Sequence, residues 1–495
     1  MVAPRAADLI YIWMKTSVRG SGRPRTDRRG AMTTTGPGAR RATPGVPSDL
    51  FASVRGVSGP GLAERLSAWI EQGVLAPGTR LPTIEEVATA SGLGRSTVAG
   101  TWSLLVDRGL VETRRRGGTI VVGPASAPAW PRAGEAPVFA GWSSVDLASA
   151  HPTTDRLPDL LEAFEHSLRE PQTNSLRREA ITPALLDAVR QDWPFDAAEW
   201  VTVSGAGEAT LLTAEAATAP GGLIAVQEPA VSGTVGNLRS VGFEVVGVGS
   251  DASGPLPDAL ERALAAGART FVYQPGGEFS LEGGVTPRRL AELADVLRAH
   301  APDAWVLEED VLGPLAPVRP LSLGGLLPGR VVRVTSFCRA FGLDLRTTVV
   351  GGARDVVLGV RRLRSHGILA QSRILQNALA HLLVTPSVAS LVADSGRWYA
   401  QRAADLAEAL AAHDVRTATP PGGLVVWVRA ENEDEALAEL GARGIVLTPS
   451  SRTFVTPPRP AWLRVATPQL PADPQRVEEL ADVLASAARG ALLAG

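Results

Sequence analysis

Hydrophobic and polar positions follow two different patterns along the chain. Between residues 48 and 122, apolar residues recur three and four positions apart, which is the spacing of one face of a helix. The first such helix is marked by Leu62, Leu66, Trp69 and Ile70. From residue 143 to residue 495, short apolar segments alternate with amphipathic helical segments, and this alternation is typical of an α/β fold. The pattern predicts a small, mostly helical domain followed by a large α/β domain.

Residues 1–47 and 123–142 show neither pattern. The first segment is rich in Arg, Gly, Pro and Thr and is predicted to be a disordered basic tail. The second contains four prolines and is predicted to be a linker. The basic tail either contacts phosphates or is simply an unstructured extension. Met32 is an alternative start for the chain.

Composition narrows the classes of protein to which this chain can belong. At 495 residues it is long enough for two or three domains, and its hydrophobic content of 45% is ample for packed cores. No segment approaches the roughly 18 consecutive apolar residues that a membrane span needs. The only cysteine, Cys338, permits no disulfide within the chain, and the six histidines are scattered. We therefore expect a cytoplasmic protein with no metal site and no membrane partner.

The helical domain has the elements of a DNA-binding unit. Thr83 and Glu86 have the spacing of a capping box, which predicts the start of a second helix. A short glycine-containing turn separates this helix from a third one that begins near Arg95, and such a pair is typical of a helix-turn-helix. Two short apolar segments then flank a basic turn at residues 114–118, and they predict a β-hairpin, or wing.

Several side chains of this domain are suited to DNA. The start of the third helix would present polar groups to base edges and phosphates, and the cationic tip of the wing would contact phosphates or the minor groove. The alternative is an unrelated three-helix domain with a solvated run of arginines. We predict double-stranded operator DNA as the partner. The predicted contact residues are Arg80, Arg95, Ser96, Thr97, Arg114, Arg115, Arg116 and Gly117.

This domain resembles the GntR family of winged-helix regulators. The resemblance rests on the segments LAPGTRLP at 75–82, GRSTV at 94–98 and LLVDRGLV at 104–111. One position departs from the family: Glu85 stands where an arginine usually faces DNA. A carboxylate there would repel phosphate, so the resemblance implies that affinity rests more on Arg80, Arg95 and the wing.

The large domain resembles a fold-type-I aminotransferase, and a GntR-type domain fused to such a domain is the layout of the MocR subfamily. The landmarks, in order, are VSGA at 203–206, QEP at 227–229, YQP at 273–275, LEED at 307–310, GLDLR at 342–346 and GGL at 422–424. In that subfamily the domain usually holds pyridoxal phosphate (PLP) and senses an amino compound. The resemblance also implies a homodimer in which the winged helices read DNA half-sites.

The resemblance implies a degenerate PLP site. PLP enzymes bind their cofactor through a lysine amine, whereas the only lysine of this chain is Lys15 and the expected lysine position is Arg339. Glu309 matches the carboxylate that pairs with the pyridinium nitrogen, with Asp310 as the alternative register. Three further cofactor contacts are replaced, by Val231, Phe279 and Val311. Arg339 either fills the lysine space and pairs with buried acids, or mimics the cofactor cation and holds Glu309.

The anion-binding part of the site is better matched. Gly205 and Ala206 lie in a loop that enters a helix and offers backbone N–H groups to an anion, although Glu208 would oppose a phosphate there. Ser336 and Arg346 match residues that hold the cofactor phosphate. Arg464 matches the arginine that binds a substrate carboxylate, or is a surface ion pair.

The leading interpretation is a transcription regulator with a pseudo-aminotransferase domain that has no catalytic residues. That domain would bind a small anionic metabolite or serve for dimerisation, with PLP expected only as a non-covalent ligand. The alternatives are an active PLP-dependent aminotransferase and a regulator whose large domain is purely structural.

Overall fold

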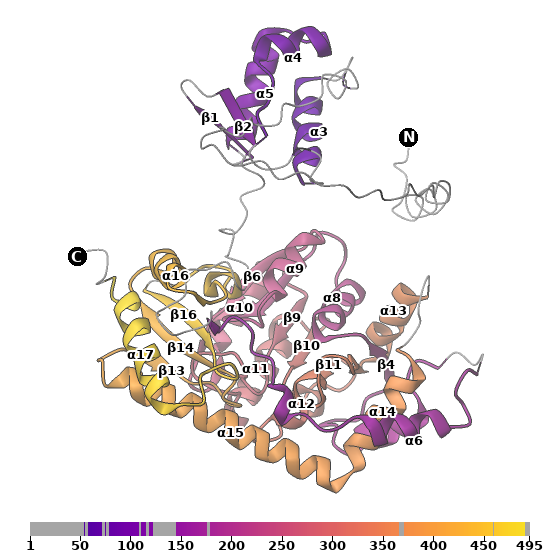
Figure 1. Cartoon of the computed structure of the whole chain (residues 1–495). Helices are drawn as coiled ribbons and strands as arrows, with labels where there is room; N and C mark the ends of the chain where they lie inside the picture. The colour runs from indigo at the N-terminus through magenta and orange to yellow at the C-terminus, as the bar shows by residue number, and fades with distance from the viewer. Residues whose placement is uncertain are drawn as a thin grey trace, which may run out of the picture. The chain divides into compact units, whose positions relative to one another are not determined.

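A computed structural model describes most of the chain, in two compact units that comprise residues 1–129 and 130–495 (Figure 1). The described residues are 54, 58–71, 75, 79–107, 110–114, 118–121, 145–175, 179–365, 371–458 and 460–490. The predicted tail, residues 1–47, and the predicted linker, residues 123–142, lie outside them.

The smaller unit is a winged helix-turn-helix, as its sequence predicts. Its helices are α3 (Gly59–Glu71), α4 (Ile84–Ser91) and α5 (Arg95–Asp107), and its wing is formed by the antiparallel strands β1 (Val111–Arg114) and β2 (Gly118–Val121). The capping box is present, because the Thr83 hydroxyl accepts from the Glu86 N–H and the Glu86 carboxylate accepts from the Thr83 N–H at 2.7 Å. α4 ends at Gly92, whose φ of 76° lies in the left-handed region.

The larger unit is built on a seven-stranded sheet of order β4-β12-β11-β10-β9-β5-β6. Only β12 runs antiparallel to its neighbours; the other strands are parallel to one another. The strands are short, nearly continuous apolar segments, as expected where helices cover both faces of a sheet. Their bounds are β4 Glu199–Val203, β5 Leu223–Gln227, β6 Glu244–Val248, β9 Thr270–Tyr273, β10 Trp305–Asp310, β11 Val331–Ser336 and β12 Thr348–Gly352.

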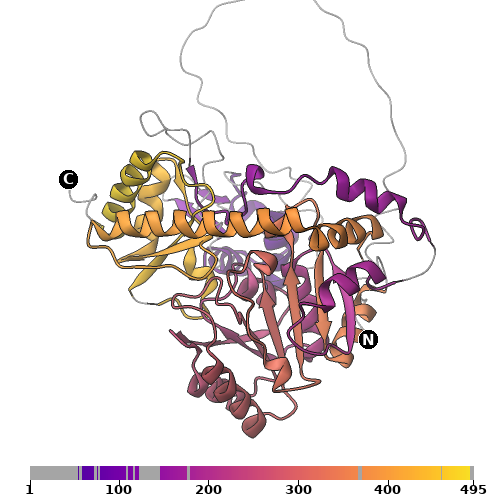
Figure 2. The same ribbon diagram turned by 90° about the horizontal axis from the view of Figure 1, so that it is seen from below.

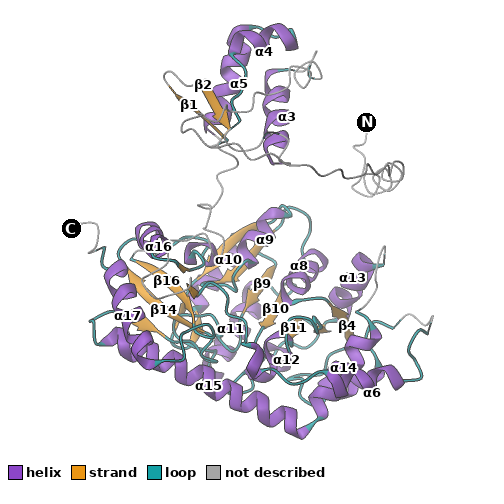
Figure 3. Cartoon of the chain, viewed as in Figure 1, coloured by secondary structure: helices purple, strands orange, loops and turns teal. Residues whose placement is uncertain are grey.

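Helices pack on both faces of this sheet (Figure 3). α8 (Ala206–Ala217), α9 (Thr234–Ser240) and α13 (Arg354–Arg364) cover one face. α10 (Pro257–Ala265) and α11 (Pro287–His300) cover the other face over β9, β10 and β5. Beside them on that second face, α7 (Pro183–Arg190) and α14 (Arg373–Val384) pack near β4 and β12. α6 (Leu161–Arg169) packs on α14.

The long helix α15 (Pro386–Ala411) runs along the large unit from α14 to the C-terminal elements (Figure 2). The elements after α15 in the chain form a second layer. That layer contains a three-stranded antiparallel sheet and two helices that cover it. Strand β3 (Val145–Asp146) pairs with β15 (Ile445–Val446), which ties the start of the unit to its end. The other elements are β13 Thr417–Ala418, β14 Val425–Ala430, β16 Ala461–Ala466, α16 Glu433–Ala442 and α17 Pro474–Ala488, with the small hairpin β7 Ser250–Asp251 and β8 Gly254–Pro255 and the short helix α12 Cys338–Phe341.

The centre of the large sheet contains a buried ion-pair network. Arg333 on β11 donates to Glu308 at 3.1 Å and to Asp310 at 2.9 Å, both on the neighbouring strand β10. Burial by itself would lower the pKa of Arg333, but the two carboxylates outweigh burial and hold that pKa above its usual value. Glu308 also accepts from the Tyr273 hydroxyl at 2.7 Å and from the Leu323 N–H at 2.8 Å. Each of the three charges in this network therefore has a partner of opposite charge, as a buried charge requires.

Among the described residues, no single helix is long and apolar enough to cross a membrane. Only α14 and α15 taken together pass that test, and they meet at 81°.

Replacing Arg333 with leucine should strongly destabilise the large unit, because it leaves two carboxylates buried without their cation. Removing one partner of a buried ion pair typically costs about 3–5 kcal/mol, and urea denaturation measures this change. Arg354→Ala is the matched control, since the Arg354 side chain is exposed and its partner Glu199 keeps a second arginine, Arg361; ion pairs with an exposed partner contribute about 1 kcal/mol or less. Equal stabilities for the two variants would contradict a structural role for the network.

Candidate functional site

Two arginines from different elements meet over one aromatic ring in the large unit. The guanidinium carbon of Arg339, on α12, lies 5.0 Å from the centroid of the Phe279 ring, and that of Arg464, on β16, lies 5.3 Å from the same centroid. Phe279 is buried in the core. Such cation–π contacts are favourable when water is excluded. The fold therefore brings together two cations that are 125 residues apart in the sequence.

Neither of these two guanidinium groups has a hydrogen-bond partner for its Nε–H among the described residues. The Nε atoms of Arg339 and Arg464 are both buried. Arg464 donates from Nη1 to the Ala148 carbonyl at 3.1 Å. Burial, together with repulsion from Arg339, lowers the pKa of Arg464 to about 10. Burial also lowers the pKa of Arg339 to about 10, although Cys338 and Glu278 oppose this shift. Both groups remain cations at neutral pH and could attract an anion.

The remaining residues predicted for this site lie around the same region. The pKa of His151 is lowered by burial and then by the charges of Arg339, Arg464 and Arg346, so all three arginines are near this imidazole. Arg346 is exposed and has an unusual φ of 28°. Its carbonyl accepts from Gln371, which also accepts from the Ser204 hydroxyl at 3.4 Å. Gln371 thus joins Arg346 to the loop before α8. Of the other predicted residues, Ser336 is buried at the end of β11, and Gly205 and Ala206 lie at the start of α8.

An internal carboxylate lies at the N-terminus of α8. Glu208 accepts from the Ser204 N–H at 2.9 Å and pairs with Arg364 at 2.9 Å. A helix N-terminus favours negative charge, and here a side chain of the chain itself supplies it. The expectation that Glu208 opposes a phosphate at this position therefore has a structural basis.

Glu309 faces α8 and α9. Its carboxylate accepts from the Thr210 hydroxyl at 2.8 Å and from the Thr234 hydroxyl at 3.2 Å. Burial raises the pKa of Glu309 to about 7, against the lowering effect of the two hydroxyls. No ion pair joins Glu309 to Arg339 among the described residues, so the idea that Arg339 holds Glu309 finds no support in the contacts. Asp310, the alternative register, points to the opposite face and pairs with Arg333.

Sequence reasoning missed one buried acid, Glu278. Its side chain is 1% exposed, and neither carboxylate oxygen has a hydrogen-bond partner among the described residues. Burial, and then the charge of Asp310, raises the pKa of Glu278 to about 8. Glu278 is also the acid whose charge acts on Arg339. The resemblance marked only its neighbour Phe279, and no local pattern distinguishes Glu278 from a surface residue.

In the smaller unit, the first turn of α5 presents the predicted DNA contacts. Arg95, Ser96 and Thr97 are all exposed. Arg95 forms an ion pair with Glu85 of α4, and both side chains are largely exposed. The acid that departs from the GntR pattern therefore lies beside a candidate phosphate contact.

The base of the wing carries the exposed Arg80, whose guanidinium packs against Gly118. The side chain of Arg114 and all of Arg115, Arg116 and Gly117 lie outside the described residues. Their predicted DNA contacts remain predictions.

Comparison with protein families assigns both units. Residues 61–121 match the bacterial regulatory proteins of the gntR family, and residues 143–484 match aminotransferase class I and II. The chain belongs to the aminotransferase class I and II family, with a gntR-family domain before it. Together these matches are the domain composition of MocR-type GntR regulators.

Similar curated proteins are named as regulators. The chain is 28% identical over 374 residues to the vitamin B6 salvage pathway transcriptional repressor PtsJ of Salmonella typhimurium, covering 74% of this chain and 84% of that protein. It is 27% identical over 469 residues to the HTH-type transcriptional regulator TauR of Rhodobacter capsulatus, covering 84% and 93%. It is 24% identical over 379 residues to the probable rhizopine catabolism regulatory protein MocR of Rhizobium meliloti, covering 69% and 74%.

Solved structures support the fold of the large unit of this MocR-type chain. A multiple substrate aminotransferase from Thermococcus profundus has a TM-score of 0.63 at 18% identity and covers 70% of this chain and 91% of its own. An aspartate aminotransferase from Thermus thermophilus with maleate has a TM-score of 0.59 at 19% identity and covers 70% and 92%. The predicted fold-type-I aminotransferase-like architecture is confirmed.

Glu309 should make stability depend on pH. Because its folded pKa is raised, the folded state binds the extra proton between pH 4.5 and about 7, and stability from this group is lost as pH rises through that window. Glu309→Gln keeps an acceptor for both threonines but cannot ionise. Below pH 4.5 the variant should have the same free energy of unfolding as the parent protein, and at pH 8 its free energy of unfolding should be higher by up to about 3 kcal/mol. Urea denaturation at several pH values tests this, and a constant difference across the window would contradict it.

Arg95 and Glu85 should have opposite effects on DNA binding. Arg95→Ala removes a cation near phosphate, so affinity should fall and the salt dependence should flatten by about one ion. Glu85→Gln removes the competing carboxylate and releases Arg95, so affinity should rise. Fluorescence anisotropy with duplex DNA over a salt series measures both effects. Glu244→Gln on the large unit is the charge-matched control, and a Glu85→Gln effect no larger than that of the control would contradict the assignment of this surface.

Proposed function

We propose that this chain is a DNA-binding transcription regulator whose aminotransferase-like domain senses a small carboxylate and catalyses no reaction. The observation that carries this proposal is the pair of guanidinium groups of Arg339 and Arg464, which share the Phe279 ring and each have a buried Nε atom without a hydrogen-bond partner among the described residues. The relatives' names as transcriptional regulators support the first part of the proposal. The chemistry of the site supports the second.

A transaminase mechanism does not fit the residues present. PLP catalysis needs a lysine amine that can lose its proton. The chain's single lysine, Lys15, lies in the N-terminal region, and Arg339 follows β11 where the resemblance places the reactive amine. A guanidinium does not supply a neutral amine nucleophile. The Phe279 ring, held by two arginines, replaces a polar cofactor contact, and Glu208 places negative charge at the start of α8. We therefore derive no step through PLP and propose it at most as a non-covalent ligand.

A carboxylate suits the same residues. Each guanidinium can donate two parallel hydrogen bonds to a carboxylate, and the repulsion between Arg339 and Arg464 would fall when an anion lies between them. A carboxylate carries less charge than a phosphate and so meets less repulsion from Glu208. The same site would accept either a mono- or a dicarboxylate.

In this proposal the smaller unit reads operator DNA through α5 and the wing. A homodimer would present two winged helices to two half-sites, which matches the symmetry of most operators. Ligand binding in the large unit would then change how the two winged helices bind operator DNA.

Two other functions predict different behaviour. An active aminotransferase would form a covalent bond with PLP that borohydride traps on one residue. A regulator with a purely structural large domain would bind no small anion. Neither is favoured by a specific observation in the site.

The experiment is a thermal-shift titration of the full chain with acetate, succinate and glutarate. At least one of these should stabilise the protein, because a ligand at about 100 times its Kd contributes about 2.7 kcal/mol. Arg464→Met should abolish the shift, whereas Arg429→Met, an exposed arginine on the adjacent strand β14, should leave it unchanged.

The outcomes separate the three functions. No shift with any carboxylate would support the structural reading. A PLP-labelled peptide after borohydride treatment would support the enzyme and contradict our proposal. A shift that survives in Arg464→Met would place the anion elsewhere.

A further inference from the structure

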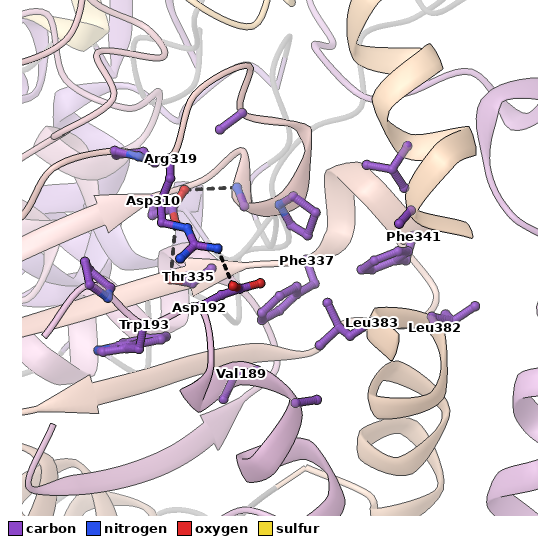
Figure 4. Close-up of a pocket in the computed structure, with 18 of the residues that line it drawn as sticks. Val189, Asp192, Trp193, Asp310, Arg319, Thr335, Phe337, Phe341, Leu382 and Leu383 are labelled. Carbon is purple, nitrogen blue, oxygen red and sulfur yellow. Dashed lines mark hydrogen bonds and ion pairs between the residues drawn. The ribbon is translucent and has the colours of Figure 1, made fainter. Parts of the chain in front are cut away.

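A cavity of about 380 Å³ opens in the large unit away from the arginine pair. It lies between the ends of β10 and β11, the loop after α7, and the helices α14 and α15. Figure 4 shows Asp310, Arg319 and Asp192 on one side of it and Phe341, Leu382 and Leu383 on the other. Its volume lies in the range of about 300–1,000 Å³ that is usual for small-molecule sites.

This cavity is distinct from the site around Arg339 and Arg464. Successive side chains of a strand point to opposite faces of the sheet. Glu309 of β10 faces α8 and α9, whereas the next residue, Asp310, faces the cavity. Neither Arg339 nor Arg464 lines it. The two arginines, their shared Phe279 ring and Glu309 are therefore all absent from the lining of this cavity.

The walls of the cavity are apolar and held in place by aromatic contacts. Phe337 stacks on Phe341 with ring centroids 6.4 Å apart. On the opposite side, the Trp193 ring meets Trp200 edge-on at 4.7 Å. Val189, Leu382 and Val392 complete the apolar lining. Such a surface suits an aromatic or branched aliphatic group.

One end of the cavity carries buried charge. Asp310, which is 5% exposed, accepts from the Gly313 N–H at 3.0 Å, from Arg333 at 2.9 Å and from the Thr335 hydroxyl at 3.3 Å. A carboxylate has about four lone-pair positions, so one acceptor position on Asp310 is left. The Thr335 oxygen, which uses its proton toward Asp310, can also accept.

The charge at this end is unbalanced. Arg333 pairs with both Glu308 and Asp310, which gives two carboxylates for one guanidinium. At the rim, Asp192 and Arg319 form an ion pair that is balanced and exposed. The cavity end therefore has a surplus of one negative charge, which favours a cation and disfavours an anion.

We propose that this cavity binds a small primary amine with an aromatic or branched aliphatic body, its ammonium group donating to Asp310 and Thr335 and its apolar body lying against Phe337, Phe341 and Leu382. This site is independent of the carboxylate site, so either proposal can fail without the other.

The experiment compares three probes with the same apolar body and different charge. The full chain is titrated with 2-phenylethylamine, 2-phenylethanol and phenylacetate by calorimetry at low ionic strength. The amine should bind more tightly than the alcohol, and at least about tenfold more tightly than phenylacetate at the cavity. In Arg464→Met, which removes the carboxylate site, phenylacetate binding as tight as that of the amine would overturn the proposal, and so would an amine that does not bind.

A variant at the cavity mouth locates the binding site. Ala393 is exposed on α15 and lines the cavity, so Ala393→Phe should reduce amine affinity at least about tenfold by filling it. Ser390→Phe, at an exposed position of α15 outside the lining, should leave affinity unchanged. Equal amine affinities in these two variants would overturn the proposal.

The same variants separate the two sites. Phenylacetate bound between Arg339 and Arg464 should be lost in Arg464→Met and retained in Ala393→Phe. Amine binding should show the reverse pattern, and loss of the amine in Arg464→Met alone would overturn the cavity assignment.

Discussion

The buried contact of Arg333 with Glu308 and Asp310 holds the two central strands of the large sheet in register and fixes what lies on each face. A buried guanidinium between two carboxylates has few alternative positions, because any shift would leave a charge without a partner. Glu309 lies between these two acids on β10, and because successive side chains of a strand alternate, it points to the opposite face of the sheet. One ion-pair network thus determines where three acidic side chains point.

That arrangement gives the sheet two different chemical faces. On one face lie Glu309, its threonine donors and the start of α8. On the other face lie Asp310, Thr335 and an apolar cavity closed by α14 and α15. The anion-attracting arginines come from α12 and β16, outside this central network. The arginine pair and the acidic end of the cavity are therefore built from different residues, and each suits a ligand of opposite charge.

Arg339 stands where the resemblance to aminotransferases places a reactive lysine. A lysine amine can lose its proton and form a bond, whereas a guanidinium keeps its charge and recognises shape and charge. Arg339 shares the Phe279 ring with Arg464 and leaves donor atoms unfilled. On the function proposed above, such an arginine pair suits recognition of an anion better than its chemical conversion.

The sequence by itself determined the order of domains, the winged helix-turn-helix and the aminotransferase-like fold. Helical spacing, the capping box at Thr83 and the ordered motifs are local signals, which can be recognised without knowledge of tertiary contacts. It also marked Arg339 and Arg464 as chemically informative positions. The pairing of Arg95 with Glu85 did not follow from it, because that contact depends on how two helices cross.

Only the tertiary structure decided which charges meet. It placed Arg339 and Arg464 over Phe279, gave Glu309 two threonine partners and buried Glu278 without a hydrogen bond among the described residues. It also formed the cavity beside Asp310. These features join residues that are far apart in the chain, and burial sets their charge energetics. A sequence read position by position contains neither the distances nor the burial on which such interactions depend.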